Sequence, residues 1–424
     1  MKKLYNLWFI AATLFLTATC TSEVDDVFDQ TAGQRIDTTI ADCQNILRSA
    51  SNGWVLNYYP SPTQEYGGYT LLIRFREDGM VDMSCELFQA DKVSSSAYDI
   101  INSAGPMLTF NSYNDVFHFF TEPANALGIG DNGKGMEGDS DFLILSCTAD
   151  EVVLTGKKTN NKMVMRPLPA GTNWKDYLQS IKKITSEAYP AAYNVTIDNQ
   201  LLYKVTQRYR KFILTNADGS KVDLPFHYTP EGICFSEELS LATLKVKELQ
   251  WNLSNMSFAN EHVVIQAQAL PKDYSRYNQY IGEYAFIYND GGTEVPVTLE
   301  EELFNESFLL KGLPINLRIR YNAIEGSIGL EFQETADGLR ILPWALGSGG
   351  NISQIKGVGL TGFLQKMTIP GGEGQEAIMA ETINLFDNGL WGGAACDSFI
   401  AIDAISGNAV LQLPKIVGFY RVAK

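Results

Sequence analysis

Four carboxylates crowd one glycine-rich stretch of the chain and are the first candidates for chemistry: Asp131, Glu137, Asp139 and Asp141. Carboxylate oxygens gathered at this density are the ligands that Ca²⁺ takes in proteins. The spacing differs from that of an EF-hand loop, which ends on a bidentate glutamate at its twelfth position. A calcium site and a solvated acidic loop therefore both remain open, and the spacing favours the loop.

Tyrosine is the second candidate, because it gathers in two separate stretches of the sequence. Rigid, partly wet rings can stack on sugars or anchor a partner protein. Tyrosine is also ordinary filling at strand edges and domain junctions, and this simpler interpretation is favoured. The candidate ligand-binding residues are Tyr58, Tyr59, Tyr66 and Tyr69 in the first stretch, and Tyr274 and Tyr277 in the second.

The sequence contains no recognisable catalytic motif. Its three histidines, His118, His227 and His262, are far apart, and neither H-E-x-x-H nor G-x-S-x-G occurs. Three glycine-rich strings resemble G-x-G-x-x-G, but none lies between a strand and a helix, as a dinucleotide site requires. We therefore predict no catalytic residues and expect a noncatalytic protein.

Charge and cysteine content restrict the partners and the chemistry further. The formal charge is −16, and without Lys2 and Lys3 it is −18, from 31 basic and 49 acidic side chains. Such a field repels phosphate backbones, so nucleic acid is not an expected partner. Five cysteines remain besides Cys20, an odd number at irregular spacing, which is neither a disulfide framework nor a metal knuckle.

The N-terminus has the pattern of an export signal. Met1-Lys2-Lys3 precedes an apolar run that is too short to span a membrane and that stops at Cys20. The run into this cysteine resembles the lipobox of bacterial lipoproteins, in which the cysteine is lipidated, although Thr19 stands where glycine or alanine is usual. An ordinary secretory signal with Cys20 as a bystander is the alternative.

We accordingly expect a signal peptide over residues 1–19 and a lipidated tether over residues 20–32. The acidic residues that follow the cysteine, Glu23, Asp25 and Asp26, resemble the export tag that sends Bacteroidetes lipoproteins to the outer face of the outer membrane. The expected location is therefore the outer membrane, with contact through the lipid anchor and exposure at the cell surface.

The body that follows reads as two helices among many short strands. Apolar residues fall on one face of a helix over residues 35–47, and Thr172 is the expected cap of a second helix that ends before Pro190. Elsewhere, β-branched and aromatic runs alternate with period two between Gly, Asn and Asp turns, and residues 116–120 are one such predicted strand.

Short antiparallel strands of this kind remove their free edges by closing into barrels or sandwiches. The length exceeds what a single hydrophobic core usually serves. We therefore predict a mainly β fold of two tandem antiparallel β-barrel or sandwich domains, calycin-like, with a few short α-helices. The N-terminal domain should cover residues 33–270 and the C-terminal domain residues 271–424.

The order of several short motifs over residues 30–190 resembles a known family. These motifs are Arg35-Ile36, Gly53-Trp54, Gly67-Gly68-Tyr69, Gly105-Pro106, Gly138-Asp139-Ser140-Asp141-Phe142 and Leu154-Thr155-Gly156-Lys157-Lys158. Together they are similar to the domain-of-unknown-function 4302 family of Bacteroidetes lipoproteins. The resemblance implies a lipidated, exported protein that serves nutrient capture at the cell surface, and it supplies no catalytic residues.

Three functions are compatible with this sequence. The first is a noncatalytic surface lipoprotein that binds a glycan, a peptide or an outer-membrane partner protein in nutrient acquisition. The second is a hydrolase acting on a glycan, for which a buried carboxylate pair in a cleft would be the distinguishing observation. The third is a structural or assembly subunit of an outer-membrane complex, which a large exposed apolar patch without a pocket would indicate.

Overall fold

The computed structural model describes residues 32–103, 105–124, 129–130, 133–188, 192–215, 218–241, 244–271, 273–335, 337–369 and 378–422. The predicted signal peptide, Cys20 and Asp131 lie outside these residues, as does the predicted tether apart from Ala32. The described chain is mainly β with a few short helices and forms tandem barrel-like units, so the predicted fold class is confirmed. No helix in these ranges is long and apolar enough to cross a membrane.

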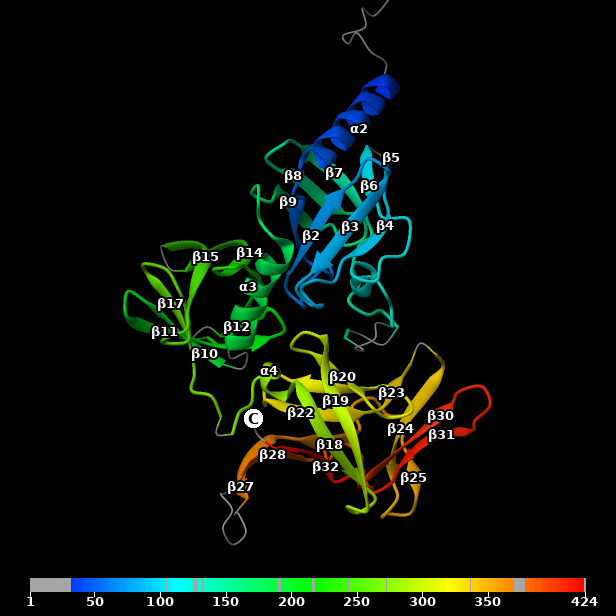
Figure 1. Ribbon diagram of the computed structural model, residues 1–424. Helices are drawn as coiled ribbons and strands as arrows, with labels where there is room; N and C mark the ends of the chain where they lie inside the picture. Colours follow the sequence, from blue (N-terminus) through cyan, green and yellow to red (C-terminus); the bar gives the residue numbers. More distant parts are fainter. Residues whose placement is uncertain are drawn as a thin grey trace, which may run out of the picture.

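The N-terminal unit is one curled antiparallel sheet. Its strands are β1 (Trp54–Tyr58), β2 (Tyr69–Phe75), β3 (Met80–Cys85), β4 (Ser94–Ala97), β5 (Asp99–Asn102), β6 (Pro106–Thr109), β7 (Asp141–Cys147), β8 (Val152–Gly156) and β9 (Lys162–Pro167). They pair in the order β4-β3-β2-β1-β9-β8-β7-β6-β5. Helix α2 (Ala32–Ser49), which contains the predicted helix, covers one end of this sheet (Figure 1). Trp54 Nε1 donates to the Leu47 carbonyl at 2.8 Å and fixes α2 on β1.

The predicted strand over residues 116–120 is wrong, because this segment contains the short 3-10 helix η1 (His118–Phe120). The Asn114 side chain accepts hydrogen bonds from the backbone N–H groups of Val116 and Phe117, at 3.2 and 3.1 Å. Side-chain acceptors that satisfy nearby backbone donors compete with a strand ladder. The alternating phenylalanines are buried all the same, since Phe117, Phe119 and Phe120 are all in the core.

A helix and a closed barrel follow. Helix α3 (Trp174–Glu187) begins one residue later than expected, because Asn173 rather than Thr172 is the cap and accepts from Asp176 N. The barrel strands, in order around the barrel, are β10 (Ala192–Ile197), β11 (Gln200–Arg208), β12 (Lys211–Thr215), β13 (Lys221–Tyr228), β14 (Gly232–Leu241), β15 (Leu244–Asn252), β16 (Ser257–Ala259) and β17 (Val263–Ala267). Ile181 and Ile184 of α3 pack on the barrel core, whereas Leu178 packs on Leu72 of the first sheet.

The C-terminal unit has two sheets around one core, preceded by the short helix α4 (Tyr277–Tyr280). The larger sheet runs β27 (Leu364–Ile369), β28 (Ile378–Asn384), β32 (Gly418–Val422), β18 (Gly282–Tyr288), β19 (Thr293–Leu303), β20 (Ser307–Lys311), β21 (Leu317–Asn322), β22 (Ser327–Glu331), β26 (Gly359–Gly362) and β29 (Phe386–Asp387). The smaller sheet contains β23 (Gln333–Glu334), β24 (Leu339–Ala345), β30 (Ser398–Asp403) and β31 (Ala409–Leu413), with β25 (Asn351–Ile352) paired to β24.

The three units lie against one another, with the barrel beside the junction of the other two (Figure 1). The span predicted as one N-terminal domain, residues 33–270, therefore contains two β units, and each has its own buried core. The domain boundary near residue 271 stays a prediction. The five cysteines of the described chain are free.

A glycine allows the first sheet and the barrel to touch backbone to backbone. Gly67 has φ +69°, and a Cβ placed on it would lie 2.1 Å from the carbonyl oxygen of Arg210 in the barrel. Next to it, Gly68 N donates to the Phe226 carbonyl at 2.9 Å. Only a residue without a side chain fits this approach.

We expect Gly67→Ala to lower the free energy of unfolding well beyond the roughly 1–2 kcal/mol that a left-handed backbone costs an alanine. Gly79→Ala is the matched control, since Gly79 has φ +77° but nothing within 4 Å of the added Cβ. Denaturant unfolding of both variants measures the difference. Equal losses would show that the contact with Arg210 does not constrain the fold.

Candidate functional site

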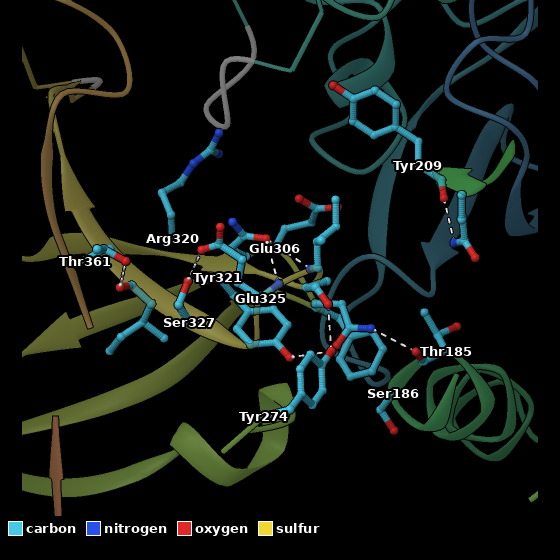
Figure 2. A pocket seen from close by; sticks show the side chains of 18 of the residues that line it. Thr185, Ser186, Tyr209, Tyr274, Glu306, Arg320, Tyr321, Glu325, Ser327 and Thr361 are labelled. Carbon is cyan, nitrogen blue, oxygen red and sulfur yellow. Dashed lines mark hydrogen bonds between the residues drawn. The ribbon is translucent and has the colours of Figure 1, made fainter. Parts of the chain in front are cut away.

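A cavity of about 860 Å³ opens where the three units meet. The first sheet contributes Tyr69, the barrel contributes Tyr209 and the C-terminal unit contributes most of the remaining lining. Figure 2 shows Arg320 and Glu306 on the C-terminal unit, with Tyr209 of the barrel facing them across the gap. Ligand sites prefer such junctions, and this volume lies within their usual range.

The floor of the cavity is the polar face of the larger C-terminal sheet. Residues that pair across antiparallel strands point to the same face, and the register places Arg320 opposite Gly329, Gly329 opposite Thr361 and Thr361 opposite Phe386. We call these four residues the floor row. Their sequence neighbours Ile319, Ile328 and Leu360 point the other way, into the core. The floor row therefore crosses four strands on the cavity side.

The middle of the floor row is open because Gly329 has no side chain. A Cβ built there would lie 3.7 Å from Glu331 Oε1 and 3.1 Å from the Leu360 carbonyl oxygen. A larger residue would therefore fill the space between Arg320 and Thr361. This glycine leaves room for a flat group to approach the sheet.

Opposite charges meet at one end of the floor row. Arg320 Nε lies 4.0 Å from Glu331 Oε2, and both side chains are about one-third exposed. Arg320 Nη1 is buried and has no hydrogen-bond partner among the described residues. Burial raises the pKa of both Glu306 and Glu331, and the nearby Arg320 guanidinium partly offsets that shift. The cavity thus offers an unused donor beside carboxyl groups that can accept or donate.

Aromatic rings form the two rims. Phe386 is 50 % exposed and stacks on Phe363, with ring centroids 6.4 Å apart and planes 24° apart. Tyr209 is 38 % exposed and packs edge-on against the buried Tyr66 at 5.2 Å. Both exposed rings present a supported apolar surface to the cavity.

Tyr209 occupies a backbone conformation that bulky residues rarely adopt, with φ +53°. It is the first central residue of the two-residue turn between Arg208 and Lys211, where glycine is usual. Gln207 Nε2 donates to the Tyr209 carbonyl at 2.8 Å and so holds the turn. Strained positions of this kind gather at binding sites.

The second turn residue, Arg210, forms the inner wall. Its guanidinium pairs with Glu86 of the first sheet and donates to the Gly68 carbonyl at 2.9 Å. It also lies over the Tyr69 ring, 4.0 Å from the centroid. Both carboxylate oxygens of Glu86 accept from Thr70 N at 3.0 Å. Although burial alone would lower the pKa of Arg210, Glu86 raises it above its ordinary value, so the guanidinium stays charged.

The structure brings only some of the predicted tyrosines to this cavity. Tyr69 and Tyr274 line it, and they come from the two different stretches. The other four, Tyr58, Tyr59, Tyr66 and Tyr277, are buried in the cores. The hydroxyl groups of three of these are hydrogen-bonded inside the protein. Tyr58 donates to the Asp139 carbonyl, Tyr59 bonds to His227 Nδ1 and Tyr277 donates to the Ser307 carbonyl.

The described members of the acidic loop lie outside the cavity. The carboxylate of Asp139 accepts from the backbone of Lys158 and Thr159, and Asp141 accepts from Thr109 Oγ1 at 2.7 Å and Lys157 Nζ at 3.1 Å. Glu137 has φ +54°. In the part of the chain that the structure covers, no three His, Cys, Asp or Glu residues cluster as metal ligands would. Since Asp131 falls outside it, the four-carboxylate calcium site stays a prediction.

Arg320, Glu306, Glu331 and Phe386 were not among the predicted site residues. The alternation Leu317-Arg318-Ile319-Arg320-Tyr321-Asn322 marks one polar face of a strand. It does not reveal that the barrel and the first sheet cover that face.

We expect Glu86→Gln to destabilise the protein by about 3–5 kcal/mol, because it leaves Arg210 buried without a counter-ion. Glu151→Gln is the matched control: Glu151 pairs with Arg166 at 2.7 Å, but both side chains are exposed, so its loss should stay below about 1 kcal/mol. Denaturant unfolding measures both. Similar small losses in the two variants would contradict the role given to Arg210.

His227 should make the protein less stable at acidic pH. Burial, with Lys247 and Arg210 nearby, lowers its pKa from 6.5 to about 3. Its contribution is therefore complete above pH 6.5 and is lost as the pH falls toward 3, since only the unfolded chain binds the proton. Between pH 7 and 4.5 this amounts to about 2–3 kcal/mol. His227→Asn, which keeps an acceptor for Tyr59, should remove that part of the pH dependence in denaturant unfolding, and an unchanged dependence would refute the assignment.

Comparison with known proteins finds matches to two family models, both described as domains of unknown function. No curated protein sequence matches it. A second family model, described as a domain of unknown function (DUF4987), matches residues 258–368. The family model described as "Domain of unknown function (DUF4302)" matches residues 24–253, which is more than half of the chain. The chain therefore belongs to the DUF4302 family.

Proposed function

We propose that this protein is a noncatalytic, exported lipoprotein of the outer-membrane surface that binds a glycan in the junction cavity. The carrying observation is the cavity itself, which combines exposed aromatic rims, an unused arginine donor and carboxyl groups. Sugars present apolar ring faces and polar hydroxyl edges, so this combination matches both kinds of surface.

The floor of the cavity favours a glycan over an extended peptide. A peptide that adds to a sheet needs unpaired backbone groups at a strand edge. The floor strands β21 and β22 are instead hydrogen-bonded to neighbours on both sides. Recognition on this floor must therefore come from side chains, as it does in most small-molecule sites.

The position of α2 suits a membrane anchor. This helix stands at the end of the N-terminal unit that lies away from the C-terminal unit (Figure 1). A lipid attached to Cys20, ahead of α2, would hold the molecule by that end. The cavity would then lie away from the bilayer, where a soluble glycan can reach it.

A glycan hydrolase is the second candidate, and Glu306 and Glu331 are the observation that favours it. Both line the cavity, and burial raises the pKa of each. A protonated carboxyl group beside an ionised one is the general arrangement of glycosidases. Arg320 lies near both glutamates and opposes this rise in the pKa of each.

The test is a binding screen of glycans and peptides by calorimetry on the Ser22–Lys424 body, with and without calcium. We expect saturable glycan binding without product, weakened about tenfold in Tyr209→Ala, as the loss of one aromatic contact predicts. Tyr113→Ala is the matched control, because Tyr113 is 64 % exposed and lies outside the cavity.

Three outcomes would overturn the proposal. New reducing ends after incubation, lost in Glu306→Gln, would establish the hydrolase instead. Glycan binding that is equally strong in Tyr209→Ala would place the site elsewhere. Saturable binding to peptides alone would exclude a glycan ligand.

A further inference from the structure

The floor row has the length and the chemistry to recognise more than one sugar ring. Four residues on four adjacent antiparallel strands span about 14 Å, since strands lie roughly 4.8 Å apart. Arg320 stands at one end and the exposed Phe386 ring at the other, with Gly329 and Thr361 between them. A polar end, a flat middle and an aromatic end follow one another along this line.

The charge around the row disfavours an anionic ligand. Three arginines line the cavity. Arg210 is already paired with Glu86, Arg320 lies beside Glu331, and Arg208 lies over the Tyr209 ring. Glu306, Glu325 and Asp387 add three further carboxyl groups to the lining, and the whole chain carries a formal charge of −16. A carboxylated sugar would therefore meet repulsion, whereas an uncharged hydroxyl can accept from arginine and donate to glutamate.

Resting on the function proposed above, we infer that the ligand is an uncharged hexose oligosaccharide lying along the floor row. One pyranose ring stacks on Phe386, which Phe363 supports from behind. The hydroxyl groups of a ring further along hydrogen-bond to the Arg320 side chain, which is 32 % exposed, and to the Glu331 carboxyl group. Gly329 provides the flat surface that the chain crosses between them.

The experiment measures affinities of the Ser22–Lys424 body for neutral hexasaccharides of glucose, mannose and galactose, and for hexagalacturonate as the acidic counterpart. We expect at least one neutral hexamer to bind, and hexagalacturonate to bind at least about tenfold more weakly than that hexamer at low salt. That gap should narrow as salt screens the repulsion.

Variants of the floor row test the binding mode. Phe386→Ala should weaken binding of the neutral hexamer about tenfold, and Gly329→Leu should abolish it by filling the floor. Arg320→Lys should weaken binding and change the preference among the neutral sugars, because an ammonium cannot reproduce the fork of the guanidinium. The control is Ile405→Ala, which removes an even more exposed apolar side chain (97 % exposed) away from the cavity.

The melting temperature of each variant shows whether Gly329→Leu disturbs the sheet. Phe386→Ala should melt at the same temperature as the wild type, because Phe386 is exposed, so it tests the binding mode even if Gly329→Leu does not fold. Equal or tighter binding of the uronate, or unchanged affinity in Phe386→Ala, would overturn this inference. If Tyr209→Ala still weakens glycan binding in that case, the proposed glycan-binding function of the cavity is retained, and only the proposed ligand class and the role of the floor row are wrong. Absence of any saturable glycan binding would overturn both.

Discussion

The buried ion pair between Arg210 and Glu86 is the interaction on which the arrangement of the molecule depends. Two charges removed from water are stable together only if their remaining hydrogen-bonding groups are also satisfied. Here Glu86 accepts a hydrogen bond from the Thr70 backbone N–H. Arg210 donates to the Gly68 carbonyl and lies over the Tyr69 ring. The partners of Arg210 all belong to the first unit, so Arg210 reaches them only when the barrel sits on the first sheet. The pair therefore favours one docking geometry, and the same two-residue turn carries Tyr209 to the cavity.

A second polar contact fixes the C-terminal unit. Lys182 of α3 donates to the Phe88 carbonyl at 2.7 Å, pairs with Glu301 of β19 and lies over the Phe304 ring at 4.4 Å. Phe304 N in turn donates to the Leu87 carbonyl of the first sheet at 2.8 Å. These contacts join residues far apart in the chain. The cavity walls are consequently held before any ligand arrives, which reduces the ordering cost of binding.

Alternation in the sequence was enough to predict the strands and the class of the fold, because burial on one face imposes a period of two. It failed at residues 116–120, where the Asn114 side chain captured backbone donors that a strand would have used. The candidate tyrosines show the limit for the site. Tyr69 and Tyr274 line one cavity, yet their convergence depends on how three units pack, and no local pattern encodes that packing. Tyr58 and Tyr277 carry the same local signal and are core residues.

The barrel closes with strands that the DUF4302 match does not include. That match ends at residue 253, whereas β16 and β17 extend from Ser257 to Ala267, and β17 pairs with β10 to complete the ring. The DUF4987 match begins at residue 258, so it includes most of β16 and all of β17, the last two strands of the barrel. A fragment cut between the two matches would expose β10 and β15 as open edges, which invite pairing with other chains. The two matches thus meet inside a single closed barrel, so the boundary between them is not a boundary between separate structural modules.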